Sequence, residues 1–185
     1  MKKKPMLKPQ HFDARLEWAR EHMHWKDEWI STLFSDEKKF NLDCPDGWAH
    51  YWNDIRKEPR TFYSRQQGGG SVMIWGAFGY NGTTNLAILK GRQCSKNYQD
   101  TLNDNLLPVA EDICGQNWTF QNDNAPIHTS RSTLKWFNDN NIRVMKWPAM
   151  SPDLNPIENL WGILARDVYA GGRQFLIIDS LKTQI

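Results

Sequence analysis

The amino-acid sequence predicts an α/β domain with a mixed five-stranded sheet, in which three antiparallel strands precede alternating helices and strands, flanked by helices. Two apolar runs, 71–78 and 85–89, flank Asn81–Gly82, a dipeptide typical of a type I′ hairpin. From residue 95 onward, helical and strand patterns alternate, which is typical of a sheet covered by helices. The length of 185 residues suits one domain with a sizeable core.

The first elements are a helix and a strand. We expect residues 1–26 to form a basic linker and a short amphipathic helix over about 9–23, because Phe12, Leu16 and Ala19 recur at helical spacing. The domain itself is expected over 27–185. Its first strand is the apolar run 29–34, which should end in the polar sequence that follows.

Residues 41–70 lack the pattern of a core segment and are expected to form an insertion, bounded by a turn cluster at 43–47 and the glycines at 68–70. Aromatic residues alternate there with basic ones. The basic residues are Arg56, Lys57, Arg60 and Arg65. This mixture can bind nucleic acid by stacking and by phosphate contacts, or the aromatic side chains can simply pack on the domain; both interpretations stay open.

The second half of the chain alternates between helix and strand. A helix is expected over 95–113 with a break or kink near Pro108, followed by a short buried strand at 118–121. Thr129 or Ser130 can cap the next helix, which should run to about residue 140. The strand 141–147 then leads into a proline-rich loop.

The stretch 147–161 begins as a stiff elbow that contains three prolines, and it continues into a helix. Asn155 suits the N-cap and Pro156 the first helical position, which places Glu158 in the first turn. Glu158 has two interpretations. It can complete a capping box with the Asn155 N–H, or the elbow can direct its carboxylate at a reaction centre.

Composition limits the class of protein. The chain has 23 Lys and Arg against 21 Asp and Glu, a net charge of only +2, so any case for nucleic acid rests on local patches. The cysteines, Cys44, Cys94 and Cys114, lack zinc-site spacing, which indicates a reduced, intracellular protein without zinc. The first residues lack the apolar core of a signal peptide, so we expect none, and no apolar run in the sequence is long enough to cross a membrane.

Three carboxylates from separate elements are candidates for a metal site. Asp36 and Asp123 are expected where strands leave the core, and 34 residues separate Asp123 from Glu158. Each has a plainer alternative: Asp123 an Asx turn, Asp36 a solvated turn acid with Glu37 an equally good ligand. Hard oxygen donors suit Mg²⁺, and two such ions about 4 Å apart can promote phosphodiester displacement.

Four segments together resemble the catalytic domain of Tc/mariner superfamily transposases, Tc branch. They are SDEKKF at 35–40, VMIWGAF at 72–78, QNDNAPIH at 121–128 and SPDLNPIENLW at 151–161. The resemblance implies an RNase H-like fold, with Asp36, Asp123 and Glu158 as catalytic residues that hold two Mg²⁺ ions, for which Mn²⁺ can substitute.

The resemblance also implies a reaction and partners. Water activated by metal would cut double-stranded DNA at transposon ends, and the freed 3′-hydroxyl would attack target DNA, usually at TA, in the nucleus. The insertion would contact DNA and a partner subunit, with a homodimer left open. His128 lies in one of the segments, where it could contact a phosphate or pack at a helix start.

The chain also departs from the family pattern. It begins in a basic linker without the paired helix-turn-helix region of family members, and the helical stripe of Ile177, Leu181 and Ile185 stops without a Gly or Pro signal. We therefore expect the chain to be cut at both ends. The alternative function is therefore an inactive or domesticated fragment that binds DNA or a protein partner without catalysis. A third alternative, a nuclease for RNA–DNA hybrids, shares the expected fold but not the four segments.

Overall fold

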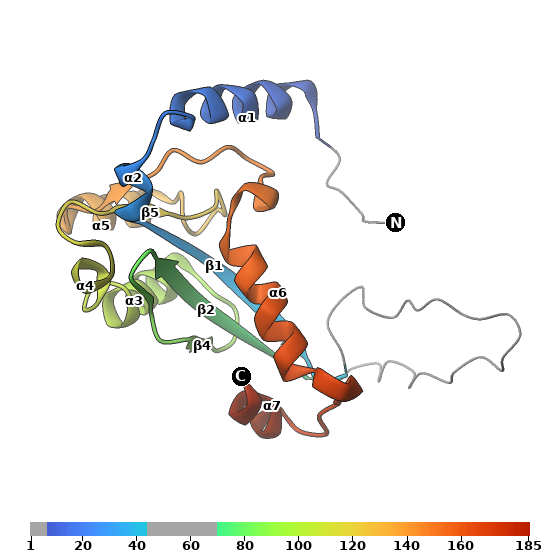
Figure 1. The fold of residues 1–185 in the computed structure, drawn as a ribbon. Coiled ribbons are helices and arrows are strands. Elements are labelled where there is room, and N and C mark those ends of the chain that lie inside the picture. The colour runs from blue at the N-terminus through green and yellow to red at the C-terminus, as the bar shows by residue number, and fades with distance from the viewer. Residues whose placement is uncertain (1–6, 44–69) are drawn as a thin grey trace, which may run out of the picture. The chain divides into compact units, whose positions relative to one another are not determined.

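A computed structural model describes residues 7–43 and 70–185 of the chain (Figure 1). In chain order the elements are α1 (Pro9–His22), α2 (Asp27–Ile30), β1 (Thr32–Asn41), β2 (Ser71–Gly79), β3 (Gly82–Thr83), β4 (Ala87–Leu89), α3 (Ser95–Asn105), α4 (Ala110–Cys114), β5 (Thr119–Gln121), α5 (Arg131–Asp139), β6 (Arg143–Val144), the 3-10 helix η1 (Pro152–Leu154), α6 (Ile157–Val168), the 3-10 helix η2 (Ala170–Gly172) and α7 (Ile178–Gln184). No helix in these two ranges has both the length and the apolar character needed to cross a membrane.

The sheet is mixed, and it has six strands in the described part of the chain. The order is β3-β2-β1-β5-β6, and β4 also pairs with β2. β1 runs parallel to β5 and β5 parallel to β6, whereas β3 is antiparallel to β2. The predicted fold class is thus confirmed, with the two-residue β3 as an addition to the five expected strands.

The chain divides into two compact units. The first contains the described residues up to Glu37 together with Trp75–Glu158. The second contains the described residues of Lys38–Ile74 together with Asn159–Ile185. Asp36, Asp123 and Glu158 all belong to the first unit, so the candidate site can be described within it.

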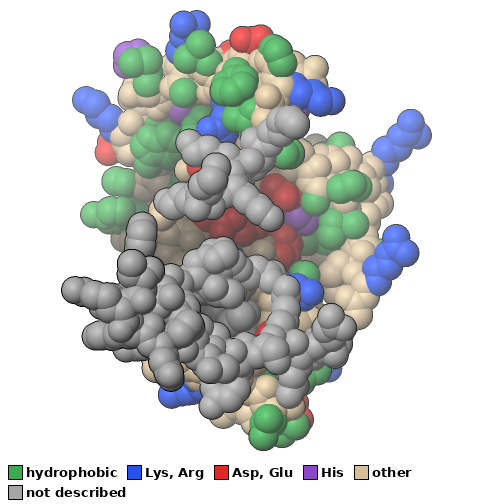
Figure 2. Space-filling view, turned by 90° about the vertical axis from the view of Figure 1, so that its right-hand side faces the viewer, with side chains coloured by type: hydrophobic (Ala, Val, Ile, Leu, Met, Phe, Trp, Pro, Cys, Tyr) green, Lys and Arg blue, Asp and Glu red, His purple; other side chains and the backbone are tan. Residues whose placement is uncertain are grey.

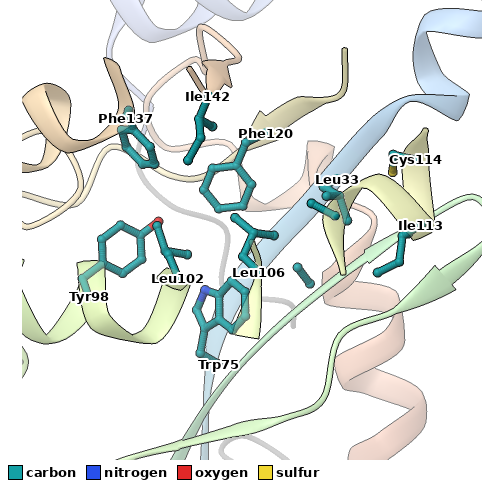
Figure 3. Packing of buried hydrophobic residues seen from close by; sticks show 12 residues of the cluster. Leu33, Trp75, Tyr98, Leu102, Leu106, Ile113, Cys114, Phe120, Phe137 and Ile142 are labelled. Carbon is teal, nitrogen blue, oxygen red and sulfur yellow. The ribbon is translucent and has the colours of Figure 1, made fainter. Parts of the chain in front are cut away.

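The core of the first unit combines side chains of β1, β2 and β5 with side chains of α3, α4 and α5 (Figure 3). Phe120 of β5 and Phe137 of α5 face each other, with ring centroids 5.9 Å apart. The buried members of the cluster are Leu33, Trp75, Ala77, Tyr98, Leu102, Leu106, Ala110, Ile113, Cys114, Phe120, Phe137 and Ile142. Burial of this apolar area is the main term that favours folding of the unit.

The predicted helix break at Pro108 is confirmed, since α3 ends at Asn105 and α4 begins at Ala110. Proline lacks the N–H that a continuous helix would need at that position. Leu106 and Ala110, on either side of the break, are both completely buried. The apolar stripe therefore continues into the core although the helix does not.

The elements of the second half follow the predicted order. Ser130, rather than Thr129, caps α5: its Oγ accepts a hydrogen bond from the Thr133 N–H at 3.2 Å. The predicted strand 141–147 is wrong in length, because only Arg143–Val144 pair as β6. Pro148 follows closely and lacks a donor for a longer ladder.

The start and end of the first strand were predicted wrongly. Residues 29 and 30 belong to α2, and β1 runs on through Asp36 to Asn41. The acids Asp27 and Glu28 favour a helical first turn, and the Thr32 Oγ1 donates to the Glu28 carbonyl at 2.8 Å. The polar residues Asp36 and Glu37 do not end the strand, because Asp36 lines a cavity and Glu37 lies beside His128.

The hairpin after β2 is present, but its predicted turn type is wrong. Gly79 pairs with Gly82, so Tyr80 and Asn81 form the turn, and neither has a positive φ. A type I′ turn requires positive φ at both central residues. Gly79 serves a packing function instead: a Cβ there would meet the Cys114 Sγ and lie 2.8 Å from the Ile113 Cγ2.

The second unit is held together around Tyr169, which follows α6. Its ring stacks on Phe40 of β1 at a centroid distance of 6.2 Å and meets Phe175 edge-on at 6.0 Å. Its hydroxyl donates to the Asn41 carbonyl at 2.5 Å, and the Phe175 N–H donates to the Leu42 carbonyl at 2.7 Å. These contacts fasten the segment after α6 to the end of β1.

We predict that Gly79→Ala destabilises the protein by about 1–3 kcal/mol, the usual cost of an extra methyl group in a packed core. The matched control is Gly82→Ala, whose Cβ would find only the Ile113 Cγ1, at 3.6 Å. Urea unfolding followed by tryptophan fluorescence measures both. Equal stabilities of the two variants would contradict the packing function of Gly79.

Candidate active site

Asp36, Asp123 and Glu158 line one cavity of about 430 Å³. β1 and β5 are parallel with Phe34 opposite Gln121, and Asp36 and Asp123 each lie two residues beyond that pair. Glu158 is the second residue of α6. In Figure 2, acidic side chains gather in a hollow of the visible face, with a histidine beside them.

The rest of the cavity wall comes mainly from the elbow before α6. Its members other than the three acids are Asn124, Ala125, Trp147, Pro148, Ala149, Met150, Ser151, Pro152 and Asn155. Residues 147–152 therefore supply a largely apolar part of the cavity wall. Apolar walls exclude water and strengthen electrostatic interactions inside a site.

Glu37 does not line this cavity, although by residue type it was as good a ligand candidate as Asp36. Successive side chains of a strand point to opposite faces, so only one of the two neighbours in β1 can face the cavity. Asp36 does. Glu37 instead lies beside His128, with its Oε1 3.4 Å from the His128 Nε2.

Two buried hydrogen bonds between Ser35 and Gln121, here called the polar seam, join β1 to β5 directly before Asp36 and Asp123. The Ser35 N–H donates to the Gln121 Oε1 at 3.2 Å, and the Ser35 Oγ donates to the Gln121 carbonyl at 2.9 Å. Both residues are buried. Because buried hydrogen bonds are costly to break, this pair fixes the register that brings Asp36 and Asp123 to the same cavity.

Asn155 connects the elbow to β1 and begins α6, as its predicted N-cap function requires. Its Oδ1 accepts from the Ile157 N–H at 3.3 Å, while its Nδ2 donates to the Ser35 carbonyl at 3.0 Å. The Asn155 N–H donates to the Pro152 carbonyl at 3.1 Å. The capping-box interpretation of Glu158 is thus wrong, since the Asn155 N–H has another acceptor and the Glu158 carboxylate lines the cavity.

Helix α1 supports the elbow from outside. Arg15 makes a two-pronged ion pair with Asp153, with nitrogen–oxygen distances of 2.8 and 2.6 Å. Its Nη1 also lies 3.4 Å from the carbonyl of Met150, which has the strained positive φ of 57°. Trp18 packs edge-on against Trp147 at a ring distance of 4.9 Å.

Asp123 is held by two donors on one oxygen. Its Oδ1 accepts from the His128 Nδ1 at 2.6 Å and from the Ala125 N–H at 2.8 Å. The second contact is the Asx turn expected for this position, so the turn and the cavity-lining roles coexist. The His128 ring stacks on Tyr98, with centroids 4.0 Å apart.

The cluster shifts the pKa values of both partners. Burial lowers the pKa of His128, but the hydrogen bond to Asp123 and the nearby Glu37 carboxylate outweigh burial and raise the pKa to about 9. Burial raises the pKa of Asp123, but the donors His128 and Ala125 hold it below the ordinary value. At neutral pH an imidazolium therefore lies between two carboxylates.

The donors suit a hard divalent cation by chemistry, because carboxylate oxygens are the ligands that Mg²⁺ and Mn²⁺ prefer. In residues 7–43 and 70–185, no three His, Cys, Asp or Glu side chains lie close enough together to hold one ion. The fold nevertheless brings the three carboxylate side chains to the wall of one cavity.

The remaining site predictions differ in outcome. Arg56, Lys57, Arg60 and Arg65 lie outside the described residues. His128 is only 3% exposed, and its two nitrogens face Asp123 and Glu37, which favours the packing alternative over a phosphate contact. Sequence reasoning missed the partnership of Glu37, His128 and Asp123, for which no spacing rule exists.

The chain is also similar in sequence to known proteins. A family model described as DDE superfamily endonuclease matches residues 31–182. The chain is 45% identical over 181 residues to the Transposable element Tc3 transposase of Caenorhabditis elegans, covering 98% of this chain and 54% of that protein. It is 38% identical over 172 residues to the Tcb1 transposase of Caenorhabditis briggsae, covering 89% and 62%. The chain thus spans about half of the first relative.

Solved structures share the fold. The mariner Mos1 paired end complex with Mg superposes with a TM-score of 0.76 at 19% identity, covering 99% of this chain and 56% of that one. The catalytic domain of Mos1 mariner transposase gives 0.67 at 19% identity, covering 98% and 82%. The fold is therefore the RNase H-like fold of these catalytic domains.

We predict that Asn155→Ala lowers the free energy of unfolding by about 2–4 kcal/mol, because it removes a helix cap and leaves the buried Ser35 carbonyl without a donor. Asn159→Ala, an exposed site in the first turn of α6, is the control and should change stability by about 0.5 kcal/mol or less. Chemical denaturation measures both. A loss below about 1 kcal/mol for Asn155→Ala would refute the connection to β1.

Proposed function

This chain belongs to the DDE superfamily endonucleases and, within them, to the Tc/mariner transposases, and we propose that it carries the metal-dependent chemistry of cut-and-paste DNA transposition. The observation that carries the proposal is the shared cavity of Asp36, Asp123 and Glu158. The three acids come from β1, the end of β5 and the start of α6, which are separate parts of the chain. A solvated surface role would not require them to line one cavity.

The cofactor in this proposal is Mg²⁺ or Mn²⁺, held as two ions by Asp36, Asp123 and Glu158. Solved mariner Mos1 paired end complexes contain Mg in one case and Mn in another, which supports a divalent ion here. Bound at this site, such ions would make water a stronger nucleophile at neutral pH and stabilise charge on the phosphate. The carboxylates neutralise the ions and fix their places.

The substrate in this proposal is double-stranded DNA. Solved structures with the same fold include a Mos1 transposase paired-end complex with a left transposon end and a Mos1 strand transfer complex. Hydrolysis of a phosphodiester at the transposon end would release a 3′-hydroxyl. That hydroxyl would then attack a phosphodiester of TA target DNA, so one bond forms as another breaks and no covalent enzyme intermediate is needed.

Other residues of the chain hold the three acids in position. Gln121 and Asn155 both bond Ser35, next to Asp36, and so hold the elements that carry Asp123 and Glu158. Preorganised charges accelerate a reaction because they need no rearrangement when charge develops. The alternative of a catalytically inactive binding fragment is not favoured, because all three carboxylates are present and line one cavity.

We predict that Asp123→Ala abolishes Mn²⁺-dependent nicking of supercoiled plasmid DNA, because the site loses a ligand carboxylate. Asp139→Ala is the matched control, since Asp139 is an exposed acid on α5 that pairs only with Lys135 among the described residues. Gel analysis of nicked product measures activity, and circular dichroism checks the fold. Retained nicking by a folded Asp123→Ala protein would overturn the assignment.

We also predict that Mn²⁺ raises the thermal midpoint of the wild type but not of Asp123→Asn. A ligand that binds only the folded state stabilises it by about 2.7 kcal/mol at a hundredfold excess over its dissociation constant. Differential scanning fluorimetry in EDTA and in millimolar MnCl₂ gives the shift. An equal shift in both proteins would place metal binding away from Asp123.

A further inference from the structure

We propose that His128 is a positioning residue for Asp123: it fixes the carboxylate through Oδ1 and so presents Oδ2 to the cavity as the oxygen that binds the cation. Glu37 in turn holds the opposite side of the imidazole. This inference rests on the proposed function, because it assigns a task to residues that surround a proposed metal ligand.

The first argument is the use of only one carboxylate oxygen. The His128 Nδ1 and the Ala125 N–H both donate to Oδ1, at 2.6 and 2.8 Å. Among the described residues, no donor reaches Oδ2. A carboxylate with one oxygen saturated and the other open offers one lone-pair direction to a cation, which favours monodentate binding.

The second argument is that the imidazole itself has little freedom. Its side chain is 3% exposed, and the ring stacks on the buried Tyr98 with a 30° angle between planes. The Nε2 lies 3.4 Å from the Glu37 Oε1, within ion-pair range but outside good hydrogen-bond geometry. Its backbone N–H also donates to the Ala125 carbonyl at 2.9 Å. Because these contacts restrict the ring, it can orient the Asp123 carboxylate to which it donates a hydrogen bond.

The third argument is that Asp123 needs such support. Its side chain is 52% exposed and follows the end of β5, so packing alone does not select one rotamer. Groups that hydrogen-bond a metal ligand typically change metal affinity by about 10–100-fold when they are removed. His128 is placed to have this effect on Asp123 without touching DNA or the cation.

Two substitutions separate positioning from mere packing. In His128→Asn the amide nitrogen can occupy the place of Nδ1, so the bond to Asp123 can persist. In His128→Gln the amide lies near the place of Nε2, so a contact with Glu37 can persist while the hydrogen bond to Asp123 is lost. Both variants lose the ring and its stacking on Tyr98, so neither differs from the other in that contact.

The experiment is calorimetric titration of Mn²⁺ into the wild type and both variants, each shown to be folded by circular dichroism. We expect His128→Asn to bind Mn²⁺ within about threefold of the wild type and His128→Gln to bind about 10–100-fold more weakly. Glu37→Gln, a second variant that leaves the ring in place, should weaken binding by less than His128→Gln does.

Equal Mn²⁺ affinities of the Asn and Gln variants, with a wild type that binds Mn²⁺, would overturn the positioning role alone. A wild type that neither binds Mn²⁺ nor nicks DNA would overturn the proposed function, and this inference with it. If one variant does not fold, the contrast between Glu37→Gln and the wild type decides: unchanged affinity overturns the role of Glu37, and a loss supports it.

Discussion

The site depends on the parallel pairing of β1 with β5 and on the buried hydrogen bonds that fix it. Three carboxylates around one cavity repel one another, so their placement is costly and something must oppose it. The opposing contacts meet at Ser35. Its N–H and hydroxyl bond to Gln121 and its carbonyl accepts from Asn155, so one buried residue connects the strands and the elbow that carry all three acids.

Two kinds of contact stabilise the first unit, and they contribute in different ways. The apolar cluster on β1, β2, β5 and helices α3 to α5 supplies most of the free energy of folding, but it is not directional. The polar seam contributes less free energy and sets direction, since each buried donor and acceptor accepts only a narrow geometry. Charged groups can line a cavity beside such a core because the seam, rather than their own contacts, keeps them there.

Directional contacts also hold Asp123, which packing alone would leave free. A half-exposed carboxylate after a short strand would be free to turn. Here it is bonded by a buried imidazole whose charge is stabilised by a second carboxylate, that of Glu37. The strand alternation that turns Asp36 to the cavity therefore also turns Glu37 to His128, and adjacent residues of one strand serve two different neighbours.

The sequence by itself determined the order of most helices and strands, the break at Pro108 and the cap at Asn155, because periodicity, proline and capping act over a few residues. It also offered the three acids as candidates, through segments that resemble a known family. The tertiary structure decided the extent of β1, the turn at Tyr80–Asn81 and the place of Glu158 on the cavity wall. It also decided the contact of Glu37 with His128. These outcomes depend on residues far apart in the chain: a strand continues, a carboxylate faces a cavity and a histidine is buried according to which distant groups lie beside them.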